Sequence, residues 1–291
     1  MRVTTRLREL LAGPDLLVAP GAYDALSARL IAQAGFFAVY MTGFGTAASA
    51  LGQPDVGLLT MSEMVNRAAA LAAVVGDLPL ISDADTGYGN PINIRRTIRE
   101  YERAGVAAVH IEDQVWPKKC GHMEGKQVIP MDEMVQKISA AVDARQDPDF
   151  VIIARTDANA VNGLEDALRR GRAFREAGAD VIFIEAPRSV AELRAIKQAF
   201  PDVPLLFNWA ESSKTPFLSL DEVQSLGFKL VLFPVSLLFA ATQAMLGLLE
   251  ILKRGETSIP FHSHMVTFAQ FTDLIGLPEI QELERRYGVN Q

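Results

Sequence analysis

The chain has 291 residues, of which 49% are hydrophobic and 22% are charged, and its formal net charge at pH 7 is −7. This length and apolar content suit one large α/β domain with a sizeable buried core. The acidic balance, with a sequence pI near 5.2, argues against nucleic-acid binding, because a surface that binds phosphates needs a basic excess.

The N-terminal stretch, MRVTTRLRELLAGPD, is not a signal peptide, because its arginines are spread through an amphipathic sequence. The most apolar long segment, residues 230–252, contains Pro234, Gln243 and Glu250. These residues make a membrane span costly, so we interpret the segment as a buried strand followed by a packed helix. The one cysteine, Cys120, cannot form an intramolecular disulfide, and the cytoplasm is the expected location.

Eight short apolar runs alternate with helical patterns along the chain. In order they are LLVAP (16–20), FFAVYM (36–41), LPLIS (78–82), AAVHI (107–111), FVIIA (150–154), DVIFI (180–184), PLLFN (204–208) and KLVLF (229–233). This alternation predicts a parallel sheet made of βα units, and eight units in a chain of this length predict a closed (β/α)8 barrel of the TIM type. A doubly wound open sheet is the alternative architecture.

Glycines mark several junctions between a predicted helix and the next strand. Gly35, Gly105 and Gly178 lie at such junctions, where a left-handed helix end suits glycine. No composition break or linker divides the chain, so we expect a single domain over residues 1–291. The tail after about residue 255 does not fit another βα unit, and it predicts one or two extra helices that pack on a neighbouring subunit.

Polar side chains follow successive predicted strands, at the ends where (β/α)8 enzymes hold their active sites. They are Tyr40 and Thr42, Asp83 and Asp85, Glu112 and Asp113, Arg155 and Asp157, Glu185, and Asn208. One such residue taken alone is more often a helix cap. Six consecutive strand ends with polar residues instead indicate a functional site.

Three of these carboxylates predict a metal site. Asp83 and Asp85 are two residues apart, so in an extended backbone they share a side, and Glu112 comes from the next strand end. Hard oxygen ligands favour Mg²⁺, or Mn²⁺, which keeps several waters and leaves room for an oxyanion substrate. The structural alternative is an Asx turn with solvated loop carboxylates.

The segment KKCGH, residues 118–122, places two lysines and His122 around the thiol of Cys120. Positive charge stabilises a thiolate, so Cys120 is a candidate proton donor and acceptor, whereas the alternative is an inert buried cysteine. Gly121 and Gly125 predict a loop that closes over the substrate and excludes water.

Three further residues have both a functional and a structural interpretation. Arg155 suits bidentate binding of a carboxylate, or it forms an ion pair with Glu185 or Asp157. Asn208 binds a carboxylate or caps the following segment. His110 lies inside an apolar run, which favours a core histidine over a ligand.

The segments TGFGTAAS, QPDVG, DADTGYG, HIEDQ, KKCGH, IARTDA and IEAP, in this order, resemble the isocitrate lyase/phosphoenolpyruvate mutase superfamily over about residues 14–255. Within it, the chain is similar to short 2-methylisocitrate lyases and 2,3-dimethylmalate lyases. The resemblance implies a magnesium-dependent retro-aldol cleavage. A base takes the substrate hydroxyl proton, the carbon–carbon bond breaks, magnesium stabilises the enolate, and Cys120 protonates it.

The resemblance also implies roles for individual positions. Asp85 is expected to bind magnesium most directly, with Asp83 and Glu112 acting largely through bound water. Catalytic roles fall on Cys120, Tyr40, Arg155, Glu112 and His122, and substrate contacts on Thr42, Gly43, Phe44, Asp55, Gly121, Arg155, Glu185 and Asn208.

The predicted activity is cleavage of a 2-methylisocitrate or alkylmalate-type acid to pyruvate or another 2-oxoacid plus a second carboxylic acid. Oxaloacetate hydrolysis or decarboxylation, carboxyphosphonoenolpyruvate mutase-like chemistry and a non-catalytic ligand-binding barrel are the alternatives. Phe44 and Trp209 depart from the expected pattern and argue against a large tricarboxylate. The resemblance further implies a homotetramer, a dimer of dimers whose partners exchange a C-terminal helix.

Overall fold

The computed structural model describes all residues except 122, 124, 212–214 and 290–291. The chain divides into two compact units, Met1–Ser236 and Leu237–Gln291. The strands of the first unit are β1 Leu17–Ala22, β2 Val39–Met41, β3 Leu80–Asp83, β4 Ala108–Glu112, β5 Val151–Thr156, β6 Val181–Ile184, β7 Leu206–Asn208 and β8 Leu230–Phe233. Each overlaps one of the predicted apolar runs, and the ends differ by three residues at most.

The eight strands form one parallel sheet that closes on itself. Their order is β6-β5-β4-β3-β2-β1-β8-β7. A parallel bridge pairs Ile182 with Leu205, and the Ile182 amide donates to the Pro204 carbonyl at 3.1 Å, which joins β6 to β7. The predicted (β/α)8 barrel is therefore confirmed, and the doubly wound open sheet is wrong.

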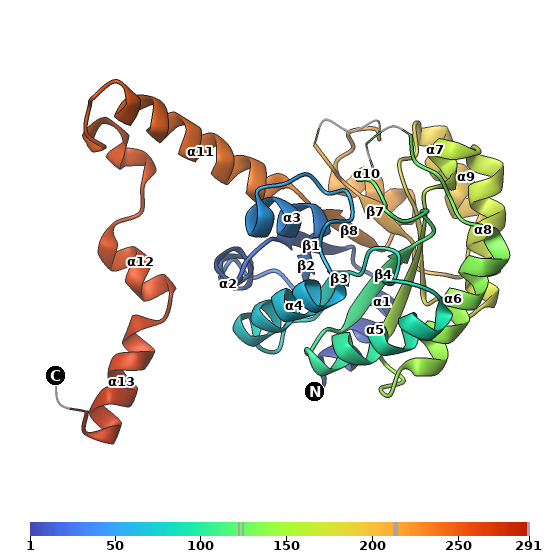
Figure 1. The fold of residues 1–291 in the computed structure, drawn as a ribbon, viewed down its shortest axis with the longest axis horizontal. Helices are drawn as coiled ribbons and strands as arrows, with labels where there is room; N and C mark the ends of the chain where they lie inside the picture. Colours follow the sequence, from blue (N-terminus) through green and yellow to red (C-terminus); the bar gives the residue numbers. More distant parts are fainter. Residues whose placement is uncertain (122, 124, 212–214, 290–291) are drawn as a thin grey trace. The chain divides into compact units, whose positions relative to one another are not determined.

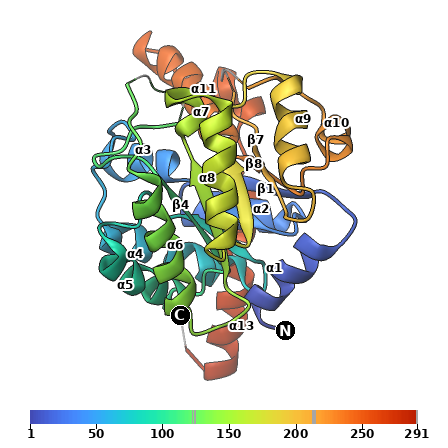
Figure 2. The same cartoon turned by 90° about the vertical axis from the view of Figure 1, so that its right-hand side faces the viewer.

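Helices surround the strands, as Figures 1 and 2 show. In the first unit they are α1 Val3–Ala12, α2 Ala25–Gln33, α3 Gly43–Leu51, α4 Met61–Val75, α5 Pro91–Arg103, α6 Met131–Ala144, α7 Ala158–Val161, α8 Leu164–Glu176, α9 Val190–Ala199 and α10 Leu220–Ser225. Capping boxes at Asp24, Thr60, Asn90 and Ser219 begin α2, α4, α5 and α10, because each side chain accepts from a backbone amide of the first turn.

The predicted helix-to-strand glycines adopt left-handed backbone angles, with φ of 84° at Gly35, 84° at Gly105 and 103° at Gly178. At Gly178 a side chain would also lie 3.1 Å from Val142, so both the angle and the space favour glycine. These junctions set where each helix ends and the following strand begins.

Helix α1 covers the N-terminal end of the barrel. Its Leu7 and Leu11 are buried in the same apolar cluster as residues of the barrel strands. Arg8 donates to the Asp149 carbonyl at 2.9 Å and to Asp180 Oδ1 at 3.0 Å. Asp149 lies two residues before β5, and Asp180 lies directly before β6. The buried polar residues of the predicted site lie at the opposite end of the barrel, at the C-terminal ends of the strands.

The second unit contains most of α11 Ser236–Lys253, then the 3₁₀ helix η1 Ile259–His264, α12 Phe268–Leu274 and α13 Leu277–Tyr287. The last two are the extra helices expected beyond about residue 255. None of the α11 residues is buried in the single chain. Among the described residues, α11 is the one helix with the length and composition to cross a membrane.

Replacing Leu7 by alanine tests how far α1 supports the barrel. Leu7 is fully buried, so Leu7→Ala should lower the free energy of unfolding by about 2–5 kcal/mol, because it removes apolar contacts and leaves a cavity. Leu220, which is 40% exposed at the start of α10, provides the control. Urea denaturation followed by circular dichroism should show a clearly smaller loss for Leu220→Ala, and equal losses would contradict the role of α1.

Candidate active site

The C-terminal strand ends place several predicted site residues at one end of the barrel. Tyr40 and Arg155 are the second-to-last residues of β2 and β5. Asp83 and Glu112 are the last residues of β3 and β4. All four side chains are at least nine-tenths buried. Glu185 directly follows β6 and is also buried, so carboxylates and a guanidinium meet where solvent is largely excluded.

Asp85 has an unusual backbone conformation. Asp85 has a φ of 48°, in the left-handed region that residues with a Cβ seldom adopt. Its amide donates to Asp83 Oδ1 at 2.9 Å, and its carbonyl accepts from the Glu112 amide at 2.9 Å. An Asx-type contact is therefore present, as in the structural alternative, yet both carboxylates stay buried rather than solvated.

Gly43 allows Asp83 to lie where it does. A Cβ at Gly43 would come within 2.3 Å of Asp83 Oδ2, so any other residue would displace that carboxylate. Thr42 accepts from the Gly45 amide at 3.2 Å and caps α3, and Phe44 lies half-buried in the first turn of this helix. The segment after β2 thus contributes a close backbone approach to Asp83.

Burial and neighbouring charge move the pKa values of the carboxylates in different directions. Burial raises the pKa of Asp85 to about 6, against the opposing effect of Lys118. Burial likewise raises the pKa of Glu112 well above its usual range, although Arg155 opposes the shift. For Asp83, burial would raise the pKa, but His110 and nearby cations outweigh it and lower the value.

Lys118 supplies positive charge to this cluster from the loop after β4. Its Nζ lies 2.6 Å from Asp55 Oδ1 and 2.8 Å from Asp85 Oδ1, and the side chain is 3% exposed. Sequence reasoning placed Asp55 on the substrate side and gave Lys118 only the role of a cation near Cys120. The signal was present in KKCGH, but its partner Asp55 is 63 residues away and cannot be read from spacing.

The carboxylates of this cluster supply oxygen donors of the kind that magnesium prefers. Among the described residues, no three histidine, cysteine or carboxylate groups lie close enough to form a complete protein cage. Magnesium usually takes only one or two carboxylates and keeps several waters. The ammonium of Lys118 against Asp85 is a cation standing at the predicted direct ligand, so the donor set accepts positive charge there.

The segment from Gln114 to Cys120 is held against the cluster by hydrogen bonds. Gln114 donates to Glu112 Oε1 at 3.0 Å and to the Lys119 carbonyl at 2.8 Å. The Cys120 amide donates to the Asp55 carbonyl at 3.1 Å. Cys120 is half-buried and outside any disulfide, which places its thiol on the loop that adjoins the carboxylates.

Gly121 approaches the strand-end residues so closely that a side chain does not fit. A Cβ there would come within 2.6 Å of both Arg155 Nη2 and Glu185 Oε1. Lys126 donates to the Gly121 carbonyl and, at 2.7 Å, to Asp157 Oδ1. The predicted His122 lies outside the described residues.

Arg155 forms ion pairs, as one of its two interpretations expected. Its Nε lies 2.9 Å from Asp157 Oδ2 and 3.2 Å from Glu112 Oε2, and its guanidinium lies over the Phe183 ring at 5.2 Å. Burial would raise the pKa of Asp157, but Arg155 and Lys126 outweigh it and lower the pKa to about 2. The guanidinium is thus fixed in orientation beside the loop.

Two strand-end residues differ in how completely their hydrogen bonds are satisfied. Asn208 Nδ2 donates to both oxygens of Glu185 at 3.3 Å, while its buried Oδ1 has no hydrogen-bond partner among the described residues. Asp113 instead accepts from Thr156 at 2.7 Å and from Arg170 at 3.1 Å. Asp113 is structural, whereas Asn208 has a polar atom left for a ligand.

His110 is buried beside the cluster and was left out of the predicted site. Tyr40 Oη and His110 Nε2 are 2.8 Å apart, and His110 Nε2 lies 3.5 Å from Asp83 Oδ1. His110 is a buried core residue, as expected, but its Nδ1 has no hydrogen-bond partner among the described residues. Burial lowers the pKa of His110 to about 4 and raises that of Tyr40 well above its usual range.

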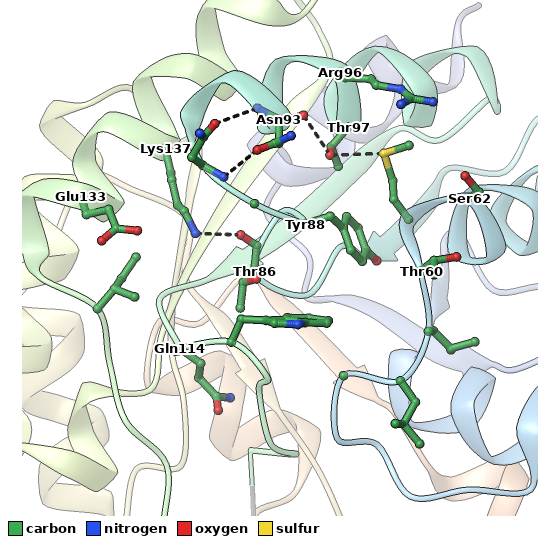
Figure 3. Close-up of a pocket in the computed structure, with 18 residues that line it drawn as sticks. Thr60, Ser62, Thr86, Tyr88, Asn93, Arg96, Thr97, Gln114, Glu133 and Lys137 are labelled. Atoms are coloured by element: carbon green, nitrogen blue, oxygen red, sulfur yellow. Dashed lines mark hydrogen bonds between the residues drawn. The ribbon is translucent and has the colours of Figure 1, made fainter.

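A cavity of about 670 Å³ lies beside these carboxylates rather than over them. It is lined by parts of α4, α5 and α6 together with Gln114 and Trp116, and the predicted metal ligands do not line it. Figure 3 shows Lys137 within it, directed at the Thr86 carbonyl at 3.2 Å. Gln114 connects this cavity to the cluster through its hydrogen bond to Glu112.

Comparison with known proteins gives the chain a consistent set of relatives. The family model described as phosphoenolpyruvate phosphomutase matches residues 7–252. A 2,3-dimethylmalate lyase from Eubacterium barkeri is 50% identical over 291 residues, covering all of both chains. A 2-methylisocitrate lyase from Bacillus subtilis is 43% identical over 283 residues, covering 96% of this chain and 91% of the relative.

Solved structures resemble the fold over almost the whole chain. Oxaloacetate acetylhydrolase in complex with the inhibitor 3,3-difluorooxalacetate matches with a TM-score of 0.93 and 39% identity, covering 99% of this chain and 97% of the other. Phosphonopyruvate hydrolase in complex with oxalate and Mg²⁺ matches with a TM-score of 0.89 and 32% identity, covering 99% of each chain.

Replacing His110 by glutamine should weaken the acid sensitivity of the fold. The pKa of a histidine in an unfolded chain is near 6.5, whereas that of His110 is about 4 in the folded protein. The unfolded chain therefore binds a proton that the folded chain excludes, and stability is lost as pH falls from 6.5 to 4. Between pH 7 and pH 5 this loss is about 2 kcal/mol, and His110→Gln should abolish that part. Urea denaturation of metal-free protein at several pH values measures it, and identical slopes for both proteins would contradict it.

Proposed function

The chain belongs to the phosphoenolpyruvate phosphomutase family and is a carbon–carbon lyase, and from this premise we propose that it cleaves an alkyl-substituted malate of the 2,3-dimethylmalate type. Breaking the bond between C2 and C3 of 2,3-dimethylmalate gives pyruvate and propionate. The observation that carries the proposal is the anchoring of the Cys120 loop, with the Cys120 amide on Asp55 and Gly121 packed against Arg155 and Glu185.

We assign the magnesium ligands to the carboxylate cluster, with Asp85 direct and with Asp83 and Glu112 acting through water. Magnesium, when bound there, supplies the positive charge that stabilises an enolate oxygen. The buried setting of the carboxylates supports this assignment, because Asp85 and Glu112 lack enough neighbouring positive charge to keep their pKa values low. Manganese suits the same oxygen donors.

The remaining residues bind the substrate and transfer its protons. Arg155, held by Asp157, presents a fixed guanidinium for a carboxylate, and Asn208 has an unsatisfied oxygen that can accept from a substrate hydroxyl. Tyr40 Oη lies 2.8 Å from His110 Nε2, so in the tautomer with the ring proton on Nδ1, Tyr40 takes the substrate hydroxyl proton while it passes its own proton to His110. Cys120 gives its proton to the carbon released by bond cleavage.

Aromatic packing after β7 supports a small substrate. The Trp209 ring lies 5.3 Å from that of Phe217 and 5.2 Å from that of Phe233, and its Nε1 donates to the Leu218 carbonyl at 2.9 Å. This fixed bulk directly follows Asn208 in the chain. It favours an alkylmalate over a 2-methylisocitrate-type tricarboxylate, which is the second substrate class.

We propose that the chain is one barrel domain with a helical extension, working in the cytoplasm as a homotetramer whose dimer partners exchange C-terminal helices. The exposed apolar residues of α11 support an association that covers them. They include Phe239, Met245, Leu246, Leu249 and Leu252, each more than 40% exposed in the single chain. Surfaces of this size and composition typically mark interfaces.

An assay of 2-oxoacid release tests the proposed lyase and names its substrate. The panel is 2,3-dimethylmalate, 2-methylisocitrate, 2-methylmalate, isocitrate and oxaloacetate, each with Mg²⁺, and the enzymes are wild type and Cys120→Ser. We expect cleavage of an alkylmalate that falls by about 10²- to 10⁴-fold in the variant, the range of a lost proton-transfer group.

Other results of the same assay would point to the alternatives. Activity confined to oxaloacetate and retained in Cys120→Ser would support a hydrolase or decarboxylase, since decarboxylation needs no such proton donor. No turnover of any of these acids would contradict the lyase proposal and favour phosphorus–carbon chemistry or simple ligand binding.

Gly121→Ala should impair catalysis by preventing the observed loop position. The new Cβ would come within 2.6 Å of Arg155 and Glu185, so the loop must shift, and displacements of this order can cost about 10²-fold in rate. Gly13→Ala is the control, because its Cβ would meet neighbours only at 3.5 Å. Steady-state kinetics should show a large fall in kcat/KM for the first variant alone. Wild-type kcat/KM for Gly121→Ala would contradict the closed-loop role.

A further inference from the structure

Lys118 lies between two carboxylates but contacts them unequally. With Asp55 it makes a hydrogen-bonded pair, at 2.7 Å to Oδ2 and 2.6 Å to Oδ1. With Asp85 it makes a single contact, at 2.8 Å to Oδ1. The ammonium therefore has two close contacts with Asp55 and one slightly longer contact with Asp85.

The oxygen contacted by Lys118 belongs to the residue assigned as the direct magnesium ligand. A metal–oxygen bond of about 2.0–2.1 Å places a divalent ion closer to that carboxylate than the ammonium now lies. Two cations this close repel strongly, because a buried site screens charge far less than water does. The weaker of the two lysine contacts, the one to Asp85, is the one expected to break.

We propose that Lys118 is an internal cation of the metal site, which neutralises Asp85 in the metal-free protein and moves off it when metal binds, while staying paired with Asp55. This inference rests on the magnesium site proposed above. Lys118 thereby lowers the affinity of the free enzyme for metal. It also makes metal binding adjust the loop, because Lys118 is two residues from Cys120 and on the same segment.

Metal titrations on the full-length protein without substrate test the inference directly. The probe is Mn²⁺, whose free concentration is measured by electron paramagnetic resonance, with Mg²⁺ added to displace it. Lys118→Met should bind Mn²⁺ at least about tenfold more tightly than wild type, or about 1.4 kcal/mol. Lys119→Met is the matched control, because it removes the same charge from the half-buried neighbouring residue, and it should change the affinity by less than about twofold.

A second variant shifts the affinity in the opposite direction. In Asp55→Asn the lysine loses its stronger partner and stays on Asp85, so Mn²⁺ should bind about tenfold more weakly than to wild type. Circular dichroism shows whether Lys118→Met folds. If it does not fold, Asp55→Asn alone tests the role of Lys118. Both variants are read by binding and not by turnover, so loss of catalysis does not obscure the result.

Each contrary result has a distinct meaning. Unchanged or weaker Mn²⁺ binding by Lys118→Met overturns the role of Lys118 but leaves the metal site standing. Unchanged or tighter binding by Asp55→Asn overturns it equally. If wild type and both variants bind no Mn²⁺, the carboxylate cluster is not a metal site, and the proposed function fails together with this inference.

Discussion

The burial of several carboxylates at one end of a barrel is the constraint on which the rest of the site depends. Asp83, Asp85 and Glu112 are almost excluded from water, and such groups are stable as anions only beside positive charge. Lys118 and Arg155 provide part of it, one from a loop and one from a strand, although the pKa values of Asp85 and Glu112 stay raised. Electrostatic need therefore brings together segments that are distant in sequence, and it leaves the cluster receptive to a further cation.

The two ends of the barrel divide stability and chemistry between them. At the N-terminal end, Leu7 and Leu11 of α1 complete the apolar core and need no unusual geometry. At the C-terminal end, polar groups are buried, backbone angles are unusual and some hydrogen bonds are missing, as at His110 Nδ1 and Asn208 Oδ1. Unsatisfied groups of this kind are costly in a folded protein, which is why they concentrate where a ligand can satisfy them.

Sequence reasoning reached the fold because the barrel repeats one local pattern. Each strand is an apolar run long enough to recognise, and the closed order follows from eight such runs. The strand-end positions of Asp83, Glu112 and Arg155 followed in the same way. Pairings across the barrel did not, because Lys118 and Asp55 are 63 residues apart and nothing local encodes their contact. Nor does an apolar run reveal that a histidine inside it contacts Tyr40.

The left-handed backbone of Asp85 has a consequence for how such sites change over evolutionary time. An L-residue in this conformation costs on the order of 1–2 kcal/mol that glycine would not incur. Thermodynamic selection alone would thus drive the position toward glycine, and only the usefulness of its carboxylate opposes that drift. In a descendant that no longer needed this carboxylate, the residue should be among the first to be lost. Its retention would indicate that the carboxylate itself is still needed.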